Sequence, residues 1–109
     1  MPKFEISDPI NMVRSHCGTK IYMASHPALR SNMRGVNRPK HFGDKVWGAS
    51  LHLVEYLEHI SANHVLDIGC GWGLVGIHIA RTINANVTCT DLDDCLEAIV
   101  LAHATLNEV

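Results

Sequence analysis

Paired metal-ligand and disulfide patterns are absent from this chain of 109 residues. Its four cysteines form no C-x-x-C pair and its eight histidines form no H-x-x-x-H pair, so the spacing predicts neither a metal site nor a disulfide framework. Reduced thiols are expected instead. No histidine can be paired with an aspartate by spacing for base catalysis, and no catalytic residue is assigned.

Long apolar runs are missing, and so is an apolar N-terminal leader. Because a membrane-spanning helix needs about 20 apolar residues, the sequence predicts no membrane partner and a cytoplasmic location. Aromatic residues make up only 6 % of the chain, and Arg81 is the one Lys or Arg in residues 46–109, against eight acidic residues. This balance disfavours a nucleic-acid partner.

Basic residues and prolines concentrate at the other end of the chain. Residues 1–45 hold eight of the nine Lys and Arg and all four prolines, and they show no sustained periodicity. We therefore expect an irregular basic arm over 1–45 and an α/β domain over 46–109. The basic residues are spaced rather than clustered, which favours a solvated arm facing the acidic half over a nucleic-acid site. They include Arg30, Arg34, Arg38, Lys40 and Lys45.

Helical and strand patterns alternate after residue 46. Leu51, Val54 and Leu57 recur at helical spacing, with Leu53 widening the apolar face, and this pattern predicts a helix from Ser50 onward. The further elements predicted are a strand at 65–68, a helix at 74–81, a strand at 86–90 and a helix at 95–106. Asp93 or Asp94 is expected to cap the last helix.

The most informative feature is the run from Val65 to Gly73. An apolar strand leads into Gly69, Gly71 and Gly73, and a helix-compatible sequence follows at once. Glycines permit positive φ angles and let a ligand approach bare backbone. Asp91 ends the next strand, 20 residues beyond Gly71, where such folds place a carboxylate to take two ribose hydroxyls. The pattern predicts a nucleotide-like ligand.

Two ligand classes fit this motif. Gly71 to Gly76 matches the dinucleotide pattern G-x-G-x-x-G. Asp67 favours a cationic ligand, because a pyrophosphate is already anionic and needs no carboxylate nearby. S-adenosylmethionine (SAM) carries an ammonium group and a sulfonium centre. The pair of Asp67 and Asp91 therefore favours SAM over a dinucleotide, which stays the weaker alternative.

With these motifs the sequence resembles the class I, seven-stranded SAM-dependent methyltransferases. Val65–Gly73 is similar to their first motif, and Asp91 is similar to the acidic end of their second strand. The segment Lys45–Leu57, with Trp47 before small residues and a tyrosine-leucine pair at its end, resembles the protein-lysine methyltransferase branch and its bacterial relatives. The resemblance covers about residues 41 to 109.

The resemblance implies SAM as the cofactor and a partial Rossmann-like, doubly wound parallel sheet, made of the first two strands and their flanking helices. Asp67 would face the methionine ammonium, Asp91 would accept the ribose hydroxyls and Leu92 would pack beside the adenine. The methyl acceptor would be a protein lysine or another nitrogen. The residues expected at the cofactor are Trp47, Asp67, Gly69, Cys70, Gly71, Gly73, Asp91 and Leu92.

The resemblance also implies that part of the fold is missing from these 109 residues. The motif after the fourth strand, which faces the methyl group and the substrate, has no counterpart here. We therefore expect the SAM-binding front half of a methyltransferase, inactive alone, with a non-catalytic interaction module as the alternative. Val65–Ile68 should be the most buried strand, with one edge to be covered by an N-terminal segment, a second copy, or the rest of a longer protein.

Overall fold

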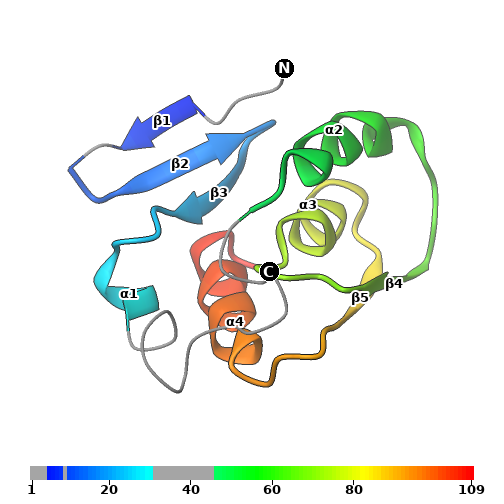
Figure 1. Ribbon diagram of the computed structural model, residues 1–109. Helices are drawn as coiled ribbons and strands as arrows, with labels where there is room; N and C mark the ends of the chain where they lie inside the picture. Colours follow the sequence, from blue (N-terminus) through cyan, green and yellow to red (C-terminus); the bar gives the residue numbers. More distant parts are fainter. Residues whose placement is uncertain (1–4, 9, 31–45) are drawn as a thin grey trace.

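The computed structural model describes residues 5–8, 10–30 and 46–109 and shows two small sheets with helices between them (Figure 1). The first sheet is antiparallel, in the order β1-β2-β3, and a short helix follows it. Its elements are β1 (Glu5–Asp8), β2 (Val13–His16), β3 (Thr19–Tyr22) and α1 (Pro27–Arg30). The second part contains α2 (Gly48–Tyr56), the 3-10 turn η2 (Leu57–His59), β4 (His64–Ile68), α3 (Leu74–Ile83), β5 (Asn86–Thr90) and α4 (Leu96–Leu106).

The N-terminal region corrects the expectation of an irregular arm. Strands β2 and β3 form a hairpin whose register runs from Val13↔Tyr22 to His16↔Thr19. Its two-residue turn, Cys17-Gly18, has φ angles of 50° and 81°, and two positive values suit the twist of a tight hairpin. Strands of four residues are too short for an alternating pattern to be recognised. The predicted basic positions Arg34, Arg38, Lys40 and Lys45 lie outside the described residues.

The predicted strand–helix–strand unit is confirmed. Strands β4 and β5 are parallel, in register from His64↔Asn86 to Ile68↔Thr90, and α3 connects them. Helix α2 begins at Gly48, two residues before the predicted start, and Leu51 and Val54 on it are buried whereas Leu53 is exposed. The start of α4 differs in one respect, because the N-cap position is occupied by Cys95 and not by Asp93 or Asp94.

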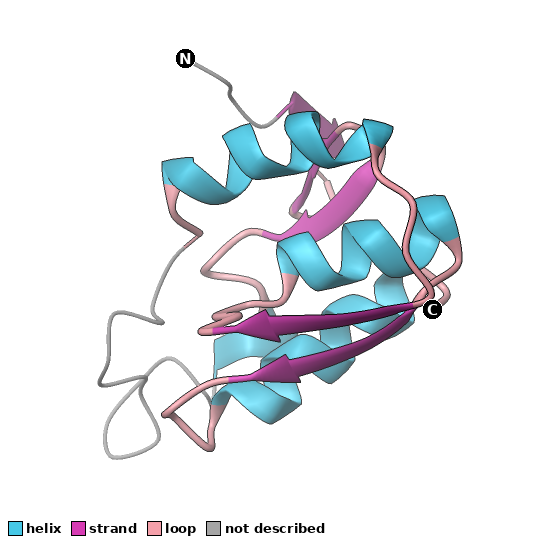
Figure 2. Ribbon diagram, turned by 90° about the vertical axis from the view of Figure 1, so that its right-hand side faces the viewer, coloured by secondary structure: helices cyan, strands magenta, loops and turns pink. Residues whose placement is uncertain are grey.

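Strand β4 is not the most buried strand, so this expectation was wrong. Its side chains alternate between half-buried and exposed, and Leu66 and Ile68 are 58 % and 78 % exposed. The cause is one-sided packing: Figure 2 looks onto the uncovered face of the two strands, with the helices behind them. Within the described part of the chain, β4 pairs with β5 alone, and the N-terminal strands form their own sheet instead of covering the open edge.

One hydrophobic core nevertheless joins the two parts of the chain. Ile21 and Leu29 from the N-terminal part pack in the same buried cluster as Leu51, Trp72 and Ile99. The junction also has polar contacts on backbone groups, because the Asn107 side chain accepts from the Lys20 N–H at 2.8 Å and donates to the Lys20 carbonyl at 2.7 Å. The expected domain boundary at residue 45 lies outside the described residues. None of the helices in the described ranges is long and apolar enough to cross a membrane.

Gly76 sets how closely α3 approaches the sheet. A Cβ at this position would lie 2.7 Å from Cys89 Sγ and 3.0 Å from a Val87 methyl group. Gly76→Ala should therefore lower the free energy of unfolding by about 1–3 kcal/mol relative to a helix glycine with free space around it. Gly48→Ala is the matched control, since a Cβ at Gly48 meets no described atom within 4 Å. Urea unfolding of both variants measures the difference, and equal stabilities would contradict close packing at Gly76.

Candidate cofactor-binding site

The glycine turn after β4 presents bare backbone to open space. Gly69 and Gly71 have φ angles of 68° and 56°, and a Cβ built on either would meet no described atom within 4 Å. Gly73 has a φ of 87° and faces the protein instead, because a Cβ there would approach the Val100 side chain to 3.1 Å. A ligand can therefore contact the backbone at Gly69 and Gly71, whereas Gly73 allows the turn to enter α3.

Asp91, at the end of β5, ties the glycine turn to the following loop. Its Oδ2 accepts a hydrogen bond from the Gly71 N–H at 2.9 Å, and its Oδ1 accepts from the N–H groups of Leu92 at 2.7 Å and Asp93 at 3.3 Å. The Cys70 N–H also donates to the Thr90 carbonyl at 2.9 Å. The carboxylate is thus held in one orientation before any ligand binds. One of its about four lone-pair sites stays open, on Oδ2, and the long bond from Asp93 is the one that a second ligand hydroxyl would replace.

Asp67 is half-buried between β4 and α3. Its Oδ2 accepts a hydrogen bond from the Gly76 N–H at 3.1 Å, so the carboxylate faces the helix that follows the glycine turn. Burial raises the pKa of Asp67 above its ordinary value and the negative charge of Asp91 raises it further, while the bond from Gly76 acts in the opposite direction. The charge of Asp91 thus opposes the ionisation of Asp67, and a cation bound near these groups would weaken this repulsion.

An open cavity of about 470 Å³ lies beside these groups. Its walls come from the ends of β4 and β5 and from the first turns of α4, and they include Cys70, Cys89, Asp91, Asp93, Glu97 and Val100. The hydrogen bond to Cys89, followed by burial, raises the pKa of the Cys70 thiol, so this thiol stays protonated at neutral pH and is no nucleophile. Leu92, expected beside the adenine, is 79 % exposed and does not line this cavity.

The two tryptophans near the turn line the same small pocket but differ in exposure. Trp47 precedes α2, is 45 % exposed, and lines a small pocket with Gly69, Cys70 and Gly71. Trp72, inside the glycine turn, is buried and stacks on His103 with ring centroids 5.6 Å apart. The structure therefore places Trp47 beside the glycine turn and Trp72 in the core cluster.

The cavity wall from α4 was not anticipated from the sequence. Asp93, Glu97 and Val100 line the cavity together with Asp94 and Leu101. The sequence pattern marked this segment only as a helix start with acidic residues in its first turn. These residues lie near Cys70 because β4 and β5 pair in parallel, which brings both strand ends to the same edge of the sheet.

A known protein family matches this chain. The family described as lysine methyltransferase matches residues 29–107, which is most of the chain and includes the whole glycine turn and Asp91. No solved structure matches this chain.

Curated proteins that align with parts of the chain include two protein-lysine methyltransferases and two RNA methyltransferases. The protein N-lysine methyltransferase METTL21A of Xenopus tropicalis is 45 % identical over 56 residues, which are 48 % of this chain and 26 % of that protein. The protein-lysine N-methyltransferase rrg1 of Schizosaccharomyces pombe is 37 % identical over 59 residues, which are 50 % of this chain and 20 % of that protein. A tRNA1(Val) (adenine(37)-N6)-methyltransferase of a Shewanella species is 44 % identical over 43 residues, which are 39 % of this chain and 18 % of that protein. The chain thus spans about a quarter or less of each relative.

Proposed function

Because this chain belongs to the lysine methyltransferase family, which uses SAM, we propose that residues 46–109 bind SAM at the glycine turn and Asp91. Gly69, Cys70 and Gly71 would bring backbone against the ligand, and Asp91 would accept the two ribose hydroxyls. Asp67 would stabilise the ammonium end through its charge. Trp47 would cover the far side of the turn, Gly73 would let the chain enter α3, and Leu92 would close over the adenine.

The observation that carries the proposal is the pair of neighbouring carboxylates at adjacent strand ends. The charge of Asp91 raises the pKa of Asp67, so the site has a negative electrostatic potential. This potential attracts a cationic ligand. A dinucleotide would instead bring its anionic pyrophosphate toward Asp67. The third glycine of the dinucleotide pattern, Gly76, is explained by the contact of α3 with Cys89 and Val87 and needs no pyrophosphate.

Titration calorimetry with SAM, S-adenosylhomocysteine and NAD tests the choice of ligand. We expect SAM and S-adenosylhomocysteine to bind in competition with each other and at least about tenfold more tightly than NAD, which corresponds to about 1.4 kcal/mol. Far-ultraviolet circular dichroism of the same sample verifies the fold. Tighter binding of NAD, or a folded chain that binds none of the three, would contradict the proposal.

For the methyl acceptor we propose a protein lysine nitrogen. The matching family and the Xenopus and Schizosaccharomyces relatives carry lysine methylation in their descriptions, whereas the Shewanella relative acts on tRNA by its name and aligns over fewer residues. The charge of residues 46–109, with Arg81 against eight acidic residues, also disfavours RNA. Methyl transfer needs nucleophile, methyl group and sulfur in line, so alignment can supply much of the rate enhancement.

The rival proposal is a non-catalytic module that keeps this half-fold and pairs its exposed β4 edge with another chain. A transfer assay with labelled SAM on a cell lysate separates the two, because a module binds a partner without labelling it. For the 109 residues alone we propose SAM binding with little methyl transfer, since the residues assigned to SAM here bind the cofactor and not the methyl acceptor. Robust turnover by these residues alone would show that they also contain the acceptor site.

A further inference from the structure

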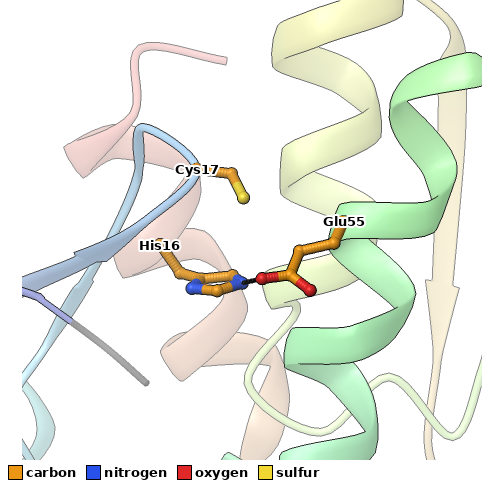
Figure 3. Close-up of side chains that lie close together, drawn as sticks. All are labelled: His16, Cys17 and Glu55. Carbon is orange, nitrogen blue, oxygen red and sulfur yellow. Dashed lines mark ion pairs between the residues drawn. The ribbon is translucent and has the colours of Figure 1, made fainter. Parts of the chain in front are cut away.

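Three potential metal ligands meet where the β2–β3 hairpin touches α2 (Figure 3). His16 and Cys17 come from the end of β2 and the hairpin turn, and Glu55 comes from the last turn of α2. Their ligand atoms all lie within 4.8 Å of one another, and His16 Nε2 is 3.5 Å from a Glu55 carboxylate oxygen. Figure 3 shows the thiol of Cys17 directed toward the space above this pair.

The spacing suits a small tetrahedral cation. Ligands at zinc bond lengths of about 2.0–2.3 Å lie roughly 3.3–3.8 Å from one another. The His16–Glu55 separation of 3.5 Å already falls in that interval. The wider separations within the cluster need a closure of about 1 Å, which corresponds to a small rotation of the exposed Cys17 and Glu55 side chains.

The chemistry of the three ligands selects the class of metal. A thiolate with an imidazole favours Zn²⁺ and related borderline or soft ions, whereas Mg²⁺ and Ca²⁺ prefer sites made of oxygen ligands. The His16 side chain is buried, and its Nε2 lies 3.1 Å from the Leu51 carbonyl in the metal-free chain. Burial therefore limits the movement of one ligand, and the other two approach from exposed positions.

The backbone at Cys17 is a second observation that points to a role for the thiol. Cys17 has a φ of 50°, a conformation in which glycine, asparagine or aspartate is favoured at this position of a hairpin turn. The hairpin turn is anchored at Cys17 and at Thr19, since Arg81 donates to the Cys17 carbonyl at 2.8 Å and to the Thr19 hydroxyl at 3.1 Å. Turn chemistry alone does not account for a cysteine here.

We propose that His16, Cys17 and Glu55 form a binding site for a Zn²⁺-class cation that clasps the hairpin to α2. On binding, the Cys17 thiol gives its proton to solvent. His16 exchanges its Nε2 proton, which now faces the Leu51 carbonyl, so that the neutral ring carries its proton on Nδ1 and coordinates through Nε2, and water completes the shell. This site is separate from the glycine turn, although α2 connects it to Trp47 at the other end of the helix. The sequence spacing did not reveal it, because the third ligand is 38 residues from the adjacent pair.

Titration of the reduced, purified chain with Co²⁺ tests the site, because cobalt bound to a thiolate gives a charge-transfer absorption in the near ultraviolet. We expect one Co²⁺ per chain, displacement by Zn²⁺, and a Tm that rises with Zn²⁺ concentration but not with Mg²⁺. Cys17→Asn and Glu55→Gln should each weaken Zn²⁺ binding by more than about tenfold, since even residues that only support a ligand contribute 10- to 100-fold. Cys17→Asn should also abolish the absorption.

The variants are chosen to keep the fold intact. Asparagine is favoured at a positive φ, so Cys17→Asn should not lower the Tm of the metal-free chain. Cys95→Asn makes the same change at the residue before α4, where asparagine is also favoured, and should leave the absorption unchanged. The proposal would be overturned by a chain without the cobalt absorption, or by an absorption that survives Cys17→Asn, which would assign the thiolate to Cys70 or Cys89.

Discussion

Asp91→Asn should weaken SAM binding by about 100-fold. Hydrogen bonds from ribose hydroxyls to a charged acceptor are worth about 1.5–3 kcal/mol each, and the amide keeps only one strong acceptor. The variant also places an NH₂ group toward the Gly71 N–H, which now donates to Asp91 Oδ2 at 2.9 Å. A total loss of about 3 kcal/mol corresponds to somewhat more than 100-fold in Kd.

Glu108→Gln is the matched control for Asp91→Asn. Glu108 is exposed, does not line the cavity, and loses the same charge. Its effect should stay below about threefold, because exposed charges are screened by solvent and salt. Calorimetry of both variants gives the comparison, and urea unfolding of the ligand-free proteins verifies that both fold. Equal losses in the two variants would mean that only the overall charge of the chain matters.

Acidification from about pH 7.5 to about pH 4.5 should cost about 3 kcal/mol of unfolding free energy through His103 alone. His103 is buried, and its Nε2 accepts a hydrogen bond from the Tyr22 N–H at 3.0 Å, so the ring must be neutral with its proton on Nδ1. Burial is the main cause that lowers the pKa of His103 from 6.5 to about 4. Protonation of Nε2 would place its N–H opposite the Tyr22 N–H, and two donors cannot share a hydrogen bond.

The sign of this effect follows from proton binding. Below about pH 6.5 the unfolded chain takes up a proton at residue 103, whereas the folded chain does so only near pH 4. Stability is therefore fully present above pH 6.5 and is lost as the pH falls through this interval. Asp67 contributes in the opposite direction, because a raised carboxyl pKa means that the folded state binds its proton more readily.

His103→Gln isolates the histidine. Glutamine can accept from the Tyr22 N–H without titrating, so the loss of stability between the two pH values should shrink by about 2–3 kcal/mol. The contribution of Asp67 is the same in both proteins and cancels. His52→Gln, at an exposed position on α2, should leave the pH dependence unchanged. An unchanged pH dependence in His103→Gln would show that this ring is not the acid-sensitive contact.

The part of the fold near the glycine turn was predictable because its information is local. The alternating glycines, the apolar strand before them and the spacing to Asp91 together fix a parallel strand–helix–strand unit, and β4, α3 and β5 lie where they were expected. The apolarity of Leu66 and Ile68 was interpreted as burial. Their exposure depends on what packs against the sheet, which a strand's own sequence does not contain.

The N-terminal sheet was not predictable, because long-range contacts hold it. The Thr19 hydroxyl bonds to His78 Nδ1 at 2.8 Å across 59 residues, and Tyr22 bonds to His103 across 81. Buried histidines serve as hydrogen-bonding partners at this junction, which explains part of the high histidine content. The metal-ligand cluster at the hairpin tip escaped detection for the same reason, since it forms only when the hairpin docks on α2.

An NMR titration of the isotope-labelled chain with S-adenosylhomocysteine and with NAD tests the central claim most directly. The account predicts that S-adenosylhomocysteine shifts the amide signals of Gly69, Gly71 and the loop at 91–93, and leaves the hairpin amides at 13–22 in place. NAD at the same concentration should shift these signals less. Larger shifts with NAD at the glycine turn, or shifts with S-adenosylhomocysteine confined to other parts of the chain, would contradict a SAM site built on Asp67 and Asp91.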